Sequence, residues 1–196
     1  MRRVLAWLML ALLCTAAAAA AADDALQAQA RLREKVDQAL EILKQPDLEL
    51  RVKKEKIVAI VEPLFDFPLM AKLVLGRKHW SRLDAHEQAR FEALFVERLK
   101  GSYVDKIDTY SDETIDWRQA VQEGPDRVQV PAALIHQDKE VVILYKLYRR
   151  SDGWKIYDVE VQGISIVSTF RSQFDQILNT GTVADLFREL EKTNGA

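Results

Sequence analysis

The segment 154–174 constrains the fold more than any other part of this chain. Its first half, from Trp154 to Val161, has the composition of a β-strand, and Gly163 follows as a turn residue. Beyond the turn, apolar side chains recur at the spacing of a helix that buries one face, namely Val167, Phe170, Phe174, Ile177 and Leu178. The segment therefore predicts a strand that ends the sheet and passes directly into an amphipathic helix.

Three more strands are predicted before this one, over residues 112–120, 126–136 and 140–150. Short turns separate the four strands, and their residues are Gly124-Pro125, Gln137-Asp138-Lys139 and Ser151-Asp152-Gly153. Consecutive strands joined by short turns pair in the antiparallel sense. The middle of the chain therefore predicts a four-stranded antiparallel meander.

Helices are predicted on both sides of these strands. They cover residues 24–44, 47–62, a short segment from Pro68 to Gly76, a long segment from Asp84 to about Tyr110, residues 164–178, and a last segment from Thr182. In the long segment, Asp84 followed by Glu87 is typical of a capping box. Strands grouped together between helices indicate an α+β fold, here a four-stranded antiparallel sheet wrapped by about six or seven helices.

The N-terminus has the pattern of a cleavable signal peptide. Arg2 and Arg3 precede an apolar run from Val4 to Leu13, and small residues follow up to Ala22. The run is shorter than the ~20 residues that span a bilayer, which disfavours an uncleaved anchor. Lipoprotein processing at Cys14 is disfavoured because the large Leu13 precedes it. We expect a signal peptide over 1–22, a single domain over 23–196, and a periplasmic location.

The composition of the expected mature chain limits which bonds it can form and which classes of partner it can bind. Cys14 is the only cysteine, so residues 23–196 form no disulfide and depend on a hydrophobic core. The leader removes two of the 28 basic residues and none of the 30 acidic ones, which leaves a net charge of −4. An acidic chain is disfavoured as a partner of nucleic acid and of anionic lipid surfaces.

The sequence favours no enzyme class. It has three histidines, and it lacks zinc-ligand spacings, a P-loop and a dinucleotide-binding glycine pattern. Tyr157 with Asp158 would be an acid–base pair in a cup-shaped enzyme, but a buried structural hydrogen bond is the interpretation we favour. We therefore predict no catalytic residue, no metal ion and no cofactor.

The apolar pattern leaves one question open. Both faces of the hairpin over 126–150 carry apolar side chains, so both need cover. Helices can supply that cover, and so can a bound apolar molecule. Periodicity does not distinguish a filled interior from a hollow one.

Several short segments together resemble the MlaC family, also called the toluene-tolerance auxiliary family. They are Phe65-Asp66-Phe67, Leu75-Gly76 with Trp80, Glu87-Gln88 to Phe95, Gly153 to Val159, Gly163-Ile-Ser165, and Arg171 to Phe174. The resemblance extends from about residue 30 to residue 192. One departure is Gln162, where the family commonly has glutamate.

The resemblance implies a fold and a function. The sheet and helices would form a cup with an apolar pocket, and the sheet would be similar to those of nuclear-transport-factor and cystatin proteins. Phospholipid tails would enter the cup while the headgroup stays at its mouth. The protein would act as a monomeric periplasmic carrier between an outer-membrane lipoprotein complex and an inner-membrane ABC transporter, maintaining outer-membrane asymmetry.

Two alternatives stay open at this point. The first is a carrier of another apolar cargo, such as a hopanoid-type lipid or an organic solvent, and the second is a small-molecule enzyme of the same cup-shaped fold. Under the carrier hypothesis, strand parity and the helical stripes predict fourteen pocket-lining residues: Phe91, Phe95, Leu99, Tyr103, Val130, Ala132, Leu134, Ile143, Tyr145, Tyr157, Val159, Ile166, Phe170 and Phe174.

Overall fold

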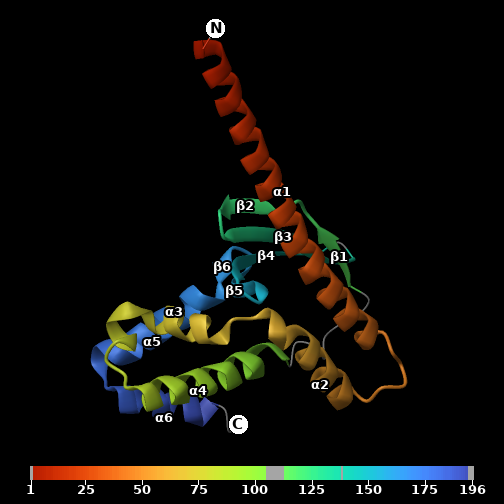
Figure 1. Cartoon of the computed structure of the whole chain (residues 1–196). Helices are drawn as coiled ribbons and strands as arrows, with labels where there is room; N and C mark the ends of the chain where they lie inside the picture. The colour runs from red at the N-terminus through yellow and green to blue at the C-terminus, as the bar shows by residue number, and fades with distance from the viewer. Residues whose placement is uncertain (1, 105–112, 138, 194–196) are drawn as a thin grey trace.

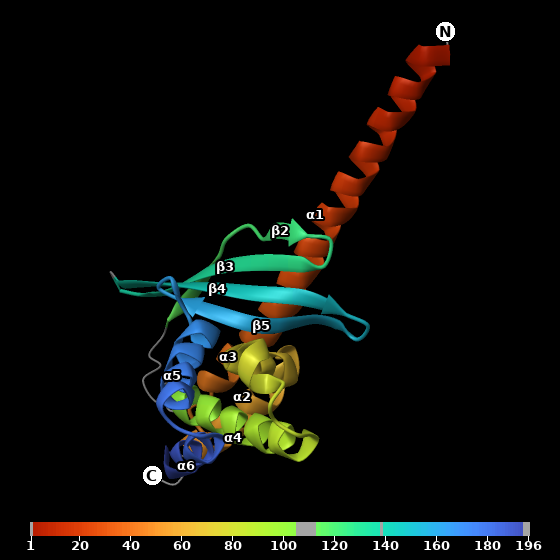
Figure 2. The same ribbon diagram turned by 90° about the vertical axis from the view of Figure 1, so that its left-hand side faces the viewer.

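The computed structural model describes residues 2–104, 113–137 and 139–193, with side chains described from residue 23 to residue 192 of those ranges. It is an α+β fold in which the sheet forms one layer and the helices gather mainly on one side of it (Figure 2). The first helix runs past the sheet, and its N-terminal turns extend beyond the body (Figure 1). Among the described residues, no helix meets the length and hydropathy needed to cross a bilayer.

The sheet contains six strands, and all their pairings are antiparallel: β1 (Thr114–Trp117), β2 (Val121–Gly124), β3 (Arg127–His136), β4 (Lys139–Arg150), β5 (Gly153–Val161) and β6 (Ile164–Ser165). The order is β1-β3-β4-β5-β6, and β2 also pairs with β3. The predicted meander is confirmed, although the described residues form six strands and not four.

The edge beside β3 is divided between two short strands at a proline. The strand β1 pairs with residues 132–135 of β3, and β2 pairs with residues 127–129. Pro131 lies between these two stretches and has no backbone N–H for the ladder, although its carbonyl still accepts a bond from Arg118 N at 3.0 Å. The remaining extra strand is β6, which pairs with the end of β5.

Apart from α1, which begins at Arg2 and not near residue 24, the helices begin and end close to where the sequence predicts. The structure contains α1 (Arg2–Leu43), α2 (Leu50–Val61), the short 3-10 helix η1 (Glu62–Leu64), α3 (Phe67–Trp80), α4 (Ala85–Tyr103), α5 (Ile166–Thr180) and α6 (Val183–Thr193). Asp84 and Glu87 form the predicted capping box of α4. Ser165 caps α5 by accepting a bond from Ser168 N. The predicted continuation from 105 to 110 lies outside the described residues.

Gly76 interrupts α3, as the sequence predicts for a C-cap. Its φ of +64° places it in the left-handed region, and one further helical turn follows before Trp80. A Cβ at this position would lie 3.0 Å from the Arg171 guanidinium. The positive φ therefore requires glycine here, whereas the exposed end of the flexible Arg171 side chain could shift to admit a Cβ.

Two hydrophobic clusters hold the layers together. In the first, which we call the helical cluster, side chains from α3, α4, α5 and α6 pack around Phe91, Phe95, Phe170 and Phe174. In the second, Ala25, Ala28 and Leu32 of α1 pack on one face of the sheet, against residues that include Val128, Val130 and Leu147. The small residues of α1 allow its backbone to lie close to the sheet.

Candidate ligand-binding pocket

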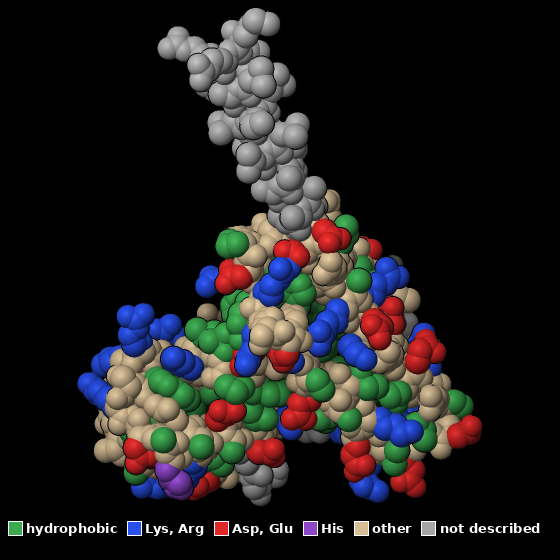
Figure 3. All heavy atoms as spheres, viewed as in Figure 1, with side chains coloured by type: hydrophobic (Ala, Val, Ile, Leu, Met, Phe, Trp, Pro, Cys, Tyr) green, Lys and Arg blue, Asp and Glu red, His purple; other side chains and the backbone are tan. Residues whose placement is uncertain are grey.

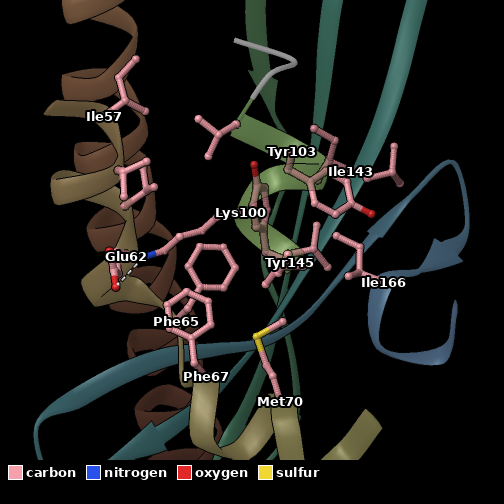
Figure 4. Close-up of a pocket in the computed structure, with 16 residues that line it drawn as sticks. Ile57, Glu62, Phe65, Phe67, Met70, Lys100, Tyr103, Ile143, Tyr145 and Ile166 are labelled. Carbon is pink, nitrogen blue, oxygen red and sulfur yellow. Dashed lines mark hydrogen bonds and ion pairs between the residues drawn. The ribbon is translucent and has the colours of Figure 1, made fainter. Parts of the chain in front are cut away.

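An apolar cavity lies at the boundary between the sheet and the helices, beside the helical cluster (Figure 4). Its volume is about 280 Å³, just below the roughly 300–1,000 Å³ typical of small-molecule pockets. Its walls come from α2, η1, α3, α4, β4, β5 and the start of α5, and sixteen residues line it: Ile57, Val58, Val61, Glu62, Phe65, Phe67, Met70, Leu99, Lys100, Tyr103, Val104, Ile143, Tyr145, Val159, Val161 and Ile166.

Two cross-strand pairs form the sheet wall of this cavity. Tyr145 lies opposite Val159, and Ile143 lies opposite Val161, in the antiparallel register of β4 and β5. Directly opposed residues project from the same face of a sheet. Tyr145 also lies opposite Val130 of β3, which packs against α1. The sheet face that contacts α1 is therefore the same face that forms this wall.

The helical wall contains a pair of stacked rings. Phe65 and Phe67 lie with ring centroids 5.5 Å apart and planes 6° from parallel. Asp66 lies between them in sequence and is buried, and its carboxylate caps α3 by accepting a bond from Leu69 N at 3.0 Å. Phe65 also bridges to Ile156 of β5, and Asp66 N donates to the Ile156 carbonyl at 2.9 Å. The backbone of these rings is therefore tied to the edge of the sheet.

The Asp66 carboxylate also accepts bonds from two side chains of β4. The Tyr148 hydroxyl donates to it, and Arg150 Nη1 lies 2.6 Å from Oδ2. Burial by itself would raise the pKa of Asp66, but the bonds from Tyr148, Leu69 N and Arg150 outweigh it and lower the pKa below 3.8. Asp66 is therefore a charged structural anchor for the start of α3.

Few polar atoms face the cavity. Burial raises the pKa of Tyr145 to about 12, and its ring stacks on Trp117 at 6.2 Å. Glu62 and Lys100 are the two charged residues among the sixteen, and they form an ion pair with Nζ 3.1 Å from Oε2. Tyr103 lies at the rim and is 43% exposed. The remaining lining residues are apolar, so the site is suited to hydrocarbon.

His79, Tyr157 and Asp158 lie outside the cavity lining. No group of three or more potential metal ligands occurs among them. His79 is buried with Nε2 3.4 Å from Asp175, and burial lowers its pKa. Asp158 accepts bonds from the Ser165 hydroxyl and Val167 N, while the Tyr157 ring meets Tyr148 edge-on at 6.0 Å. Tyr157 and Asp158 therefore do not share the cavity as an acid–base pair.

Comparison with protein families matches residues 33–192 to the family described as "MlaC protein". The chain belongs to the MlaC family. A solved structure of a phospholipid-binding protein from Ralstonia solanacearum, in complex with a phospholipid, has the same fold with a TM-score of 0.76 and 26% sequence identity. The match covers 86% of this chain and 97% of the Ralstonia chain.

Six of the fourteen residues predicted to line a pocket lie around the cavity of this MlaC-family protein: Leu99, Tyr103, Ile143, Tyr145, Val159 and Ile166. They come from the last turns of α4, from the correct face of β4 and β5, and from the first turn of α5. Strand parity had assigned Ile143, Tyr145 and Val159 to one face of the sheet, and they share the face that borders the cavity. Contact of these residues with a ligand stays a prediction.

Four predicted aromatic residues lie elsewhere. Phe91, Phe95, Phe170 and Phe174 are buried in the helical cluster, where rings from α4 and α5 meet edge to face. Each ring is packed against its neighbours, and none of the four side chains lines the cavity. They belong to helices whose C-terminal or N-terminal turns reach it.

The other four predicted residues also lie outside the lining. Val130 packs beneath α1, and Ala132 is buried opposite Trp117 of β1. Leu134 is paired with Ile115 and Val141 farther along the sheet. Tyr157 is the extra residue of a β-bulge, because Lys146 pairs with Asp158 while Leu147 pairs with Ile156. The bulge interrupts the alternation of side chains between the two faces of β5, so counting every second residue does not give the direction of Tyr157.

The sequence patterns did not indicate the cavity wall that α2, η1 and the start of α3 form. Its cavity residues are Ile57, Val58, Val61, Phe65, Phe67 and Met70. A local signal was present, because Pro63 and Pro68 bracket the two phenylalanines and keep the chain from forming one long helix there. The signal predicts an irregular segment but does not indicate which way the rings point.

Proposed function

We propose that this protein binds a phospholipid by inserting acyl chain into the apolar cavity. The observation that carries the proposal is the cavity lining, in which the only charged side chains among the described residues, Glu62 and Lys100, are paired with each other. Membership of the MlaC family and the phospholipid bound to the Ralstonia relative support it. The headgroup stays at the mouth, where water remains accessible.

The energetics of such a pocket favour carriage between membranes. Burying one methylene is worth about 0.8 kcal/mol relative to water, and a cavity of about 280 Å³ holds on the order of ten methylenes, so the buried chain would contribute ~8 kcal/mol. A bilayer shelters the same chains equally well, so transfer between bilayer and protein is nearly balanced. Release into water is prohibitive, and loading and unloading therefore require docking on a membrane complex.

The proposed route follows from the family and the N-terminal pattern. Residues 1–22 direct export and are removed, and the domain over 23–196 carries lipid as a monomer through the periplasm. It exchanges lipid with an outer-membrane lipoprotein complex and an inner-membrane ABC transporter. Among the described side chains of α1, those buried in the fold begin at Ala25, just after the expected cleavage site. Intact mass measurement of periplasmic protein tests the cleavage.

Lipid recovered from two matched variants tests the binding proposal. Ile143 points into the cavity, whereas Leu144, its neighbour on β4, projects from the opposite face of the sheet. We expect Ile143→Trp to lose the phospholipid that co-purifies with the wild-type protein, and Leu144→Trp to keep it. Solvent extraction and mass spectrometry measure the lipid, while circular dichroism checks that both variants are folded.

Three results would contradict the proposal. Wild-type protein purified from the periplasm with no amphiphile would exclude stable lipid carriage. If the Ile143 and Leu144 variants are both folded and lose lipid equally, the lipid does not bind in this cavity. Recovery of a terpenoid or an organic solvent in place of phospholipid would assign the protein to the other apolar-cargo class.

A further inference from the structure

The positive charge at the edge of the cavity has a specific position. Lys100 comes from the last turn of α4, and its side chain is 29% exposed, while that of its partner Glu62 is 42% exposed. The aliphatic part of Lys100 lies among apolar lining residues, and the ammonium group reaches the ion pair marked in Figure 4. The pair therefore marks the place where the apolar cavity meets water.

The two partners differ in their freedom to move. Glu62 is the first residue of η1, directly before Pro63, whose carbonyl accepts a bond from Lys155 Nζ of β5 at 2.9 Å. The backbone at Glu62 is therefore tied to the sheet. Lys100 reaches across from another helix on a flexible four-carbon stem. Partly exposed ion pairs are weak, so the ammonium group can exchange Glu62 for a stronger anionic partner.

Resting on the proposed function, we propose that Lys100 binds the phosphate of the lipid headgroup and that Glu62 holds it in place while the cavity is empty. An amphiphile whose chains fill the cavity places its phosphate where the lining meets water. Lys100 is the only cation among the described residues that line the cavity. Exchange of one anion for another keeps the ammonium group paired at each stage and makes a phosphate-bearing lipid the preferred ligand.

Glu62 has the opposite effect on the same equilibrium. A phosphate that approaches Lys100 also approaches the Glu62 carboxylate, which repels it and competes for Nζ. Removing the charge of Glu62 therefore strengthens phosphate binding, and removing the charge of Lys100 weakens it. A diacylglycerol with the same chains carries no phosphate, so neither change alters its binding through charge.

A competition experiment with the mature protein isolates the phosphate. Protein is equilibrated with detergent micelles that contain equal amounts of dioleoylphosphatidic acid and dioleoylglycerol, and the bound lipids are quantified by mass spectrometry. We expect Lys100→Gln to lower the bound ratio of phosphatidic acid to diacylglycerol about three- to tenfold, Lys100→Arg to preserve it, and Glu62→Gln to raise it. Lys72→Gln, an exposed lysine of α3 outside the lining, is the control and leaves the ratio unchanged.

The outcomes separate this inference from the proposed function. If wild-type protein takes up neither lipid, the proposed function fails and this inference fails with it. If Lys100→Gln binds both lipids in the wild-type ratio, or loses both in equal proportion, the phosphate contact is excluded while acyl-chain binding stands or falls on the Ile143 experiment. A ratio that falls equally in Lys72→Gln would assign the effect to net charge and overturn the assignment to Lys100.

Discussion

The helical cluster and the cavity are both built from aromatic and aliphatic side chains, yet one is filled and the other is hollow. In the cluster, Phe95 meets Phe170 at 5.5 Å and 89°, and Phe91 meets Phe174 at 5.6 Å and 83°, so rings from two helices interlock. Beside the cavity, Phe65 and Phe67 stack on each other, from a single short segment. Across from them lie aliphatic side chains of the sheet, such as Ile143 and Val159.

The difference shows that spacing between elements, rather than residue type, decides whether an apolar region is filled. Neighbouring helices approach until their side chains interdigitate. The segment at Phe65–Phe67 is instead held at the edge of β5 by the backbone bond from Asp66 N to the Ile156 carbonyl and by the Asp66 carboxylate. These polar contacts fix the position of the Phe65–Phe67 segment relative to the sheet, and its two rings do not fill the space between them and β4. Four pairs of substitutions test this comparison.

The largest expected effect is that of Phe95→Ala in the helical cluster. Phe95 is fully buried and contacts three other rings, so truncation should lower the free energy of unfolding by about 3–5 kcal/mol. Phe67→Ala removes a ring that borders a void and should cost about 1–2 kcal/mol. Urea unfolding measures both, and equal losses would show that the two regions are packed alike.

Next is Asp66→Asn, which removes the charge that anchors the cavity wall. We expect a loss of about 1.5–3 kcal/mol at neutral pH, because the carboxylate accepts bonds from Arg150 and Tyr148. Its pKa is lowered by folding, so this stability is present above pH ~3.8 and is lost as the pH falls through the lower folded value. Wild type and variant should therefore converge in acid. Asp84→Asn, an exposed cap, is the control, and an equal loss there would remove the special role of Asp66.

A third pair inserts the same ring into each region. Val74→Phe adds volume to the fully buried helical cluster and should destabilise the protein by about 1–3 kcal/mol. Val58→Phe projects into the cavity, where space exists, and should change stability by less than about 1 kcal/mol while reducing co-purifying lipid. Thermal unfolding and lipid extraction measure the two effects. A Val58 variant as unstable as the Val74 variant would mean that the cavity does not accept added volume.

Tyr145→Phe should have the smallest effect at neutral pH, less than about 0.5 kcal/mol, because in the described residues the cavity-facing hydroxyl has no hydrogen-bond partner. Burial raises the pKa of Tyr145 from 10.0 to about 12, so as the pH rises above 10 this hydroxyl ionises in the unfolded chain before it does in the folded one. The free energy of unfolding of the wild type therefore falls between pH 10 and pH 12, by at most about 1.4 kcal/mol per pH unit. The variant should lose this alkaline slope. Tyr157→Phe, outside the cavity, should keep it, and a Tyr145 variant with the wild-type slope would contradict the assignment.

Local sequence signals predicted much of the fold because short-range chemistry governs them. Asp84 and Glu87 marked the start of α4, Gly76 marked the break in α3, and alternation placed Ile143, Tyr145 and Val159 on one face of the sheet. Strand parity failed at Tyr157, because a bulge adds one residue between paired positions. The edge beside β3 is divided into β1 and β2 near Pro131, and this division depends on which side of β3 the missing N–H of the proline would face.

The order of elements, the antiparallel meander and the apolar faces are properties of this sequence alone, because each follows from backbone geometry and from the spacing of side chains along the chain. The location of the cavity was decided only by tertiary structure. A stripe such as Phe91, Phe95 and Leu99 has one period throughout, yet its first members are buried against α5 and its last member borders the void. Periodicity fixes which side of an element is apolar, whereas the distance to the opposing element, set by long-range contacts, decides what fills the space.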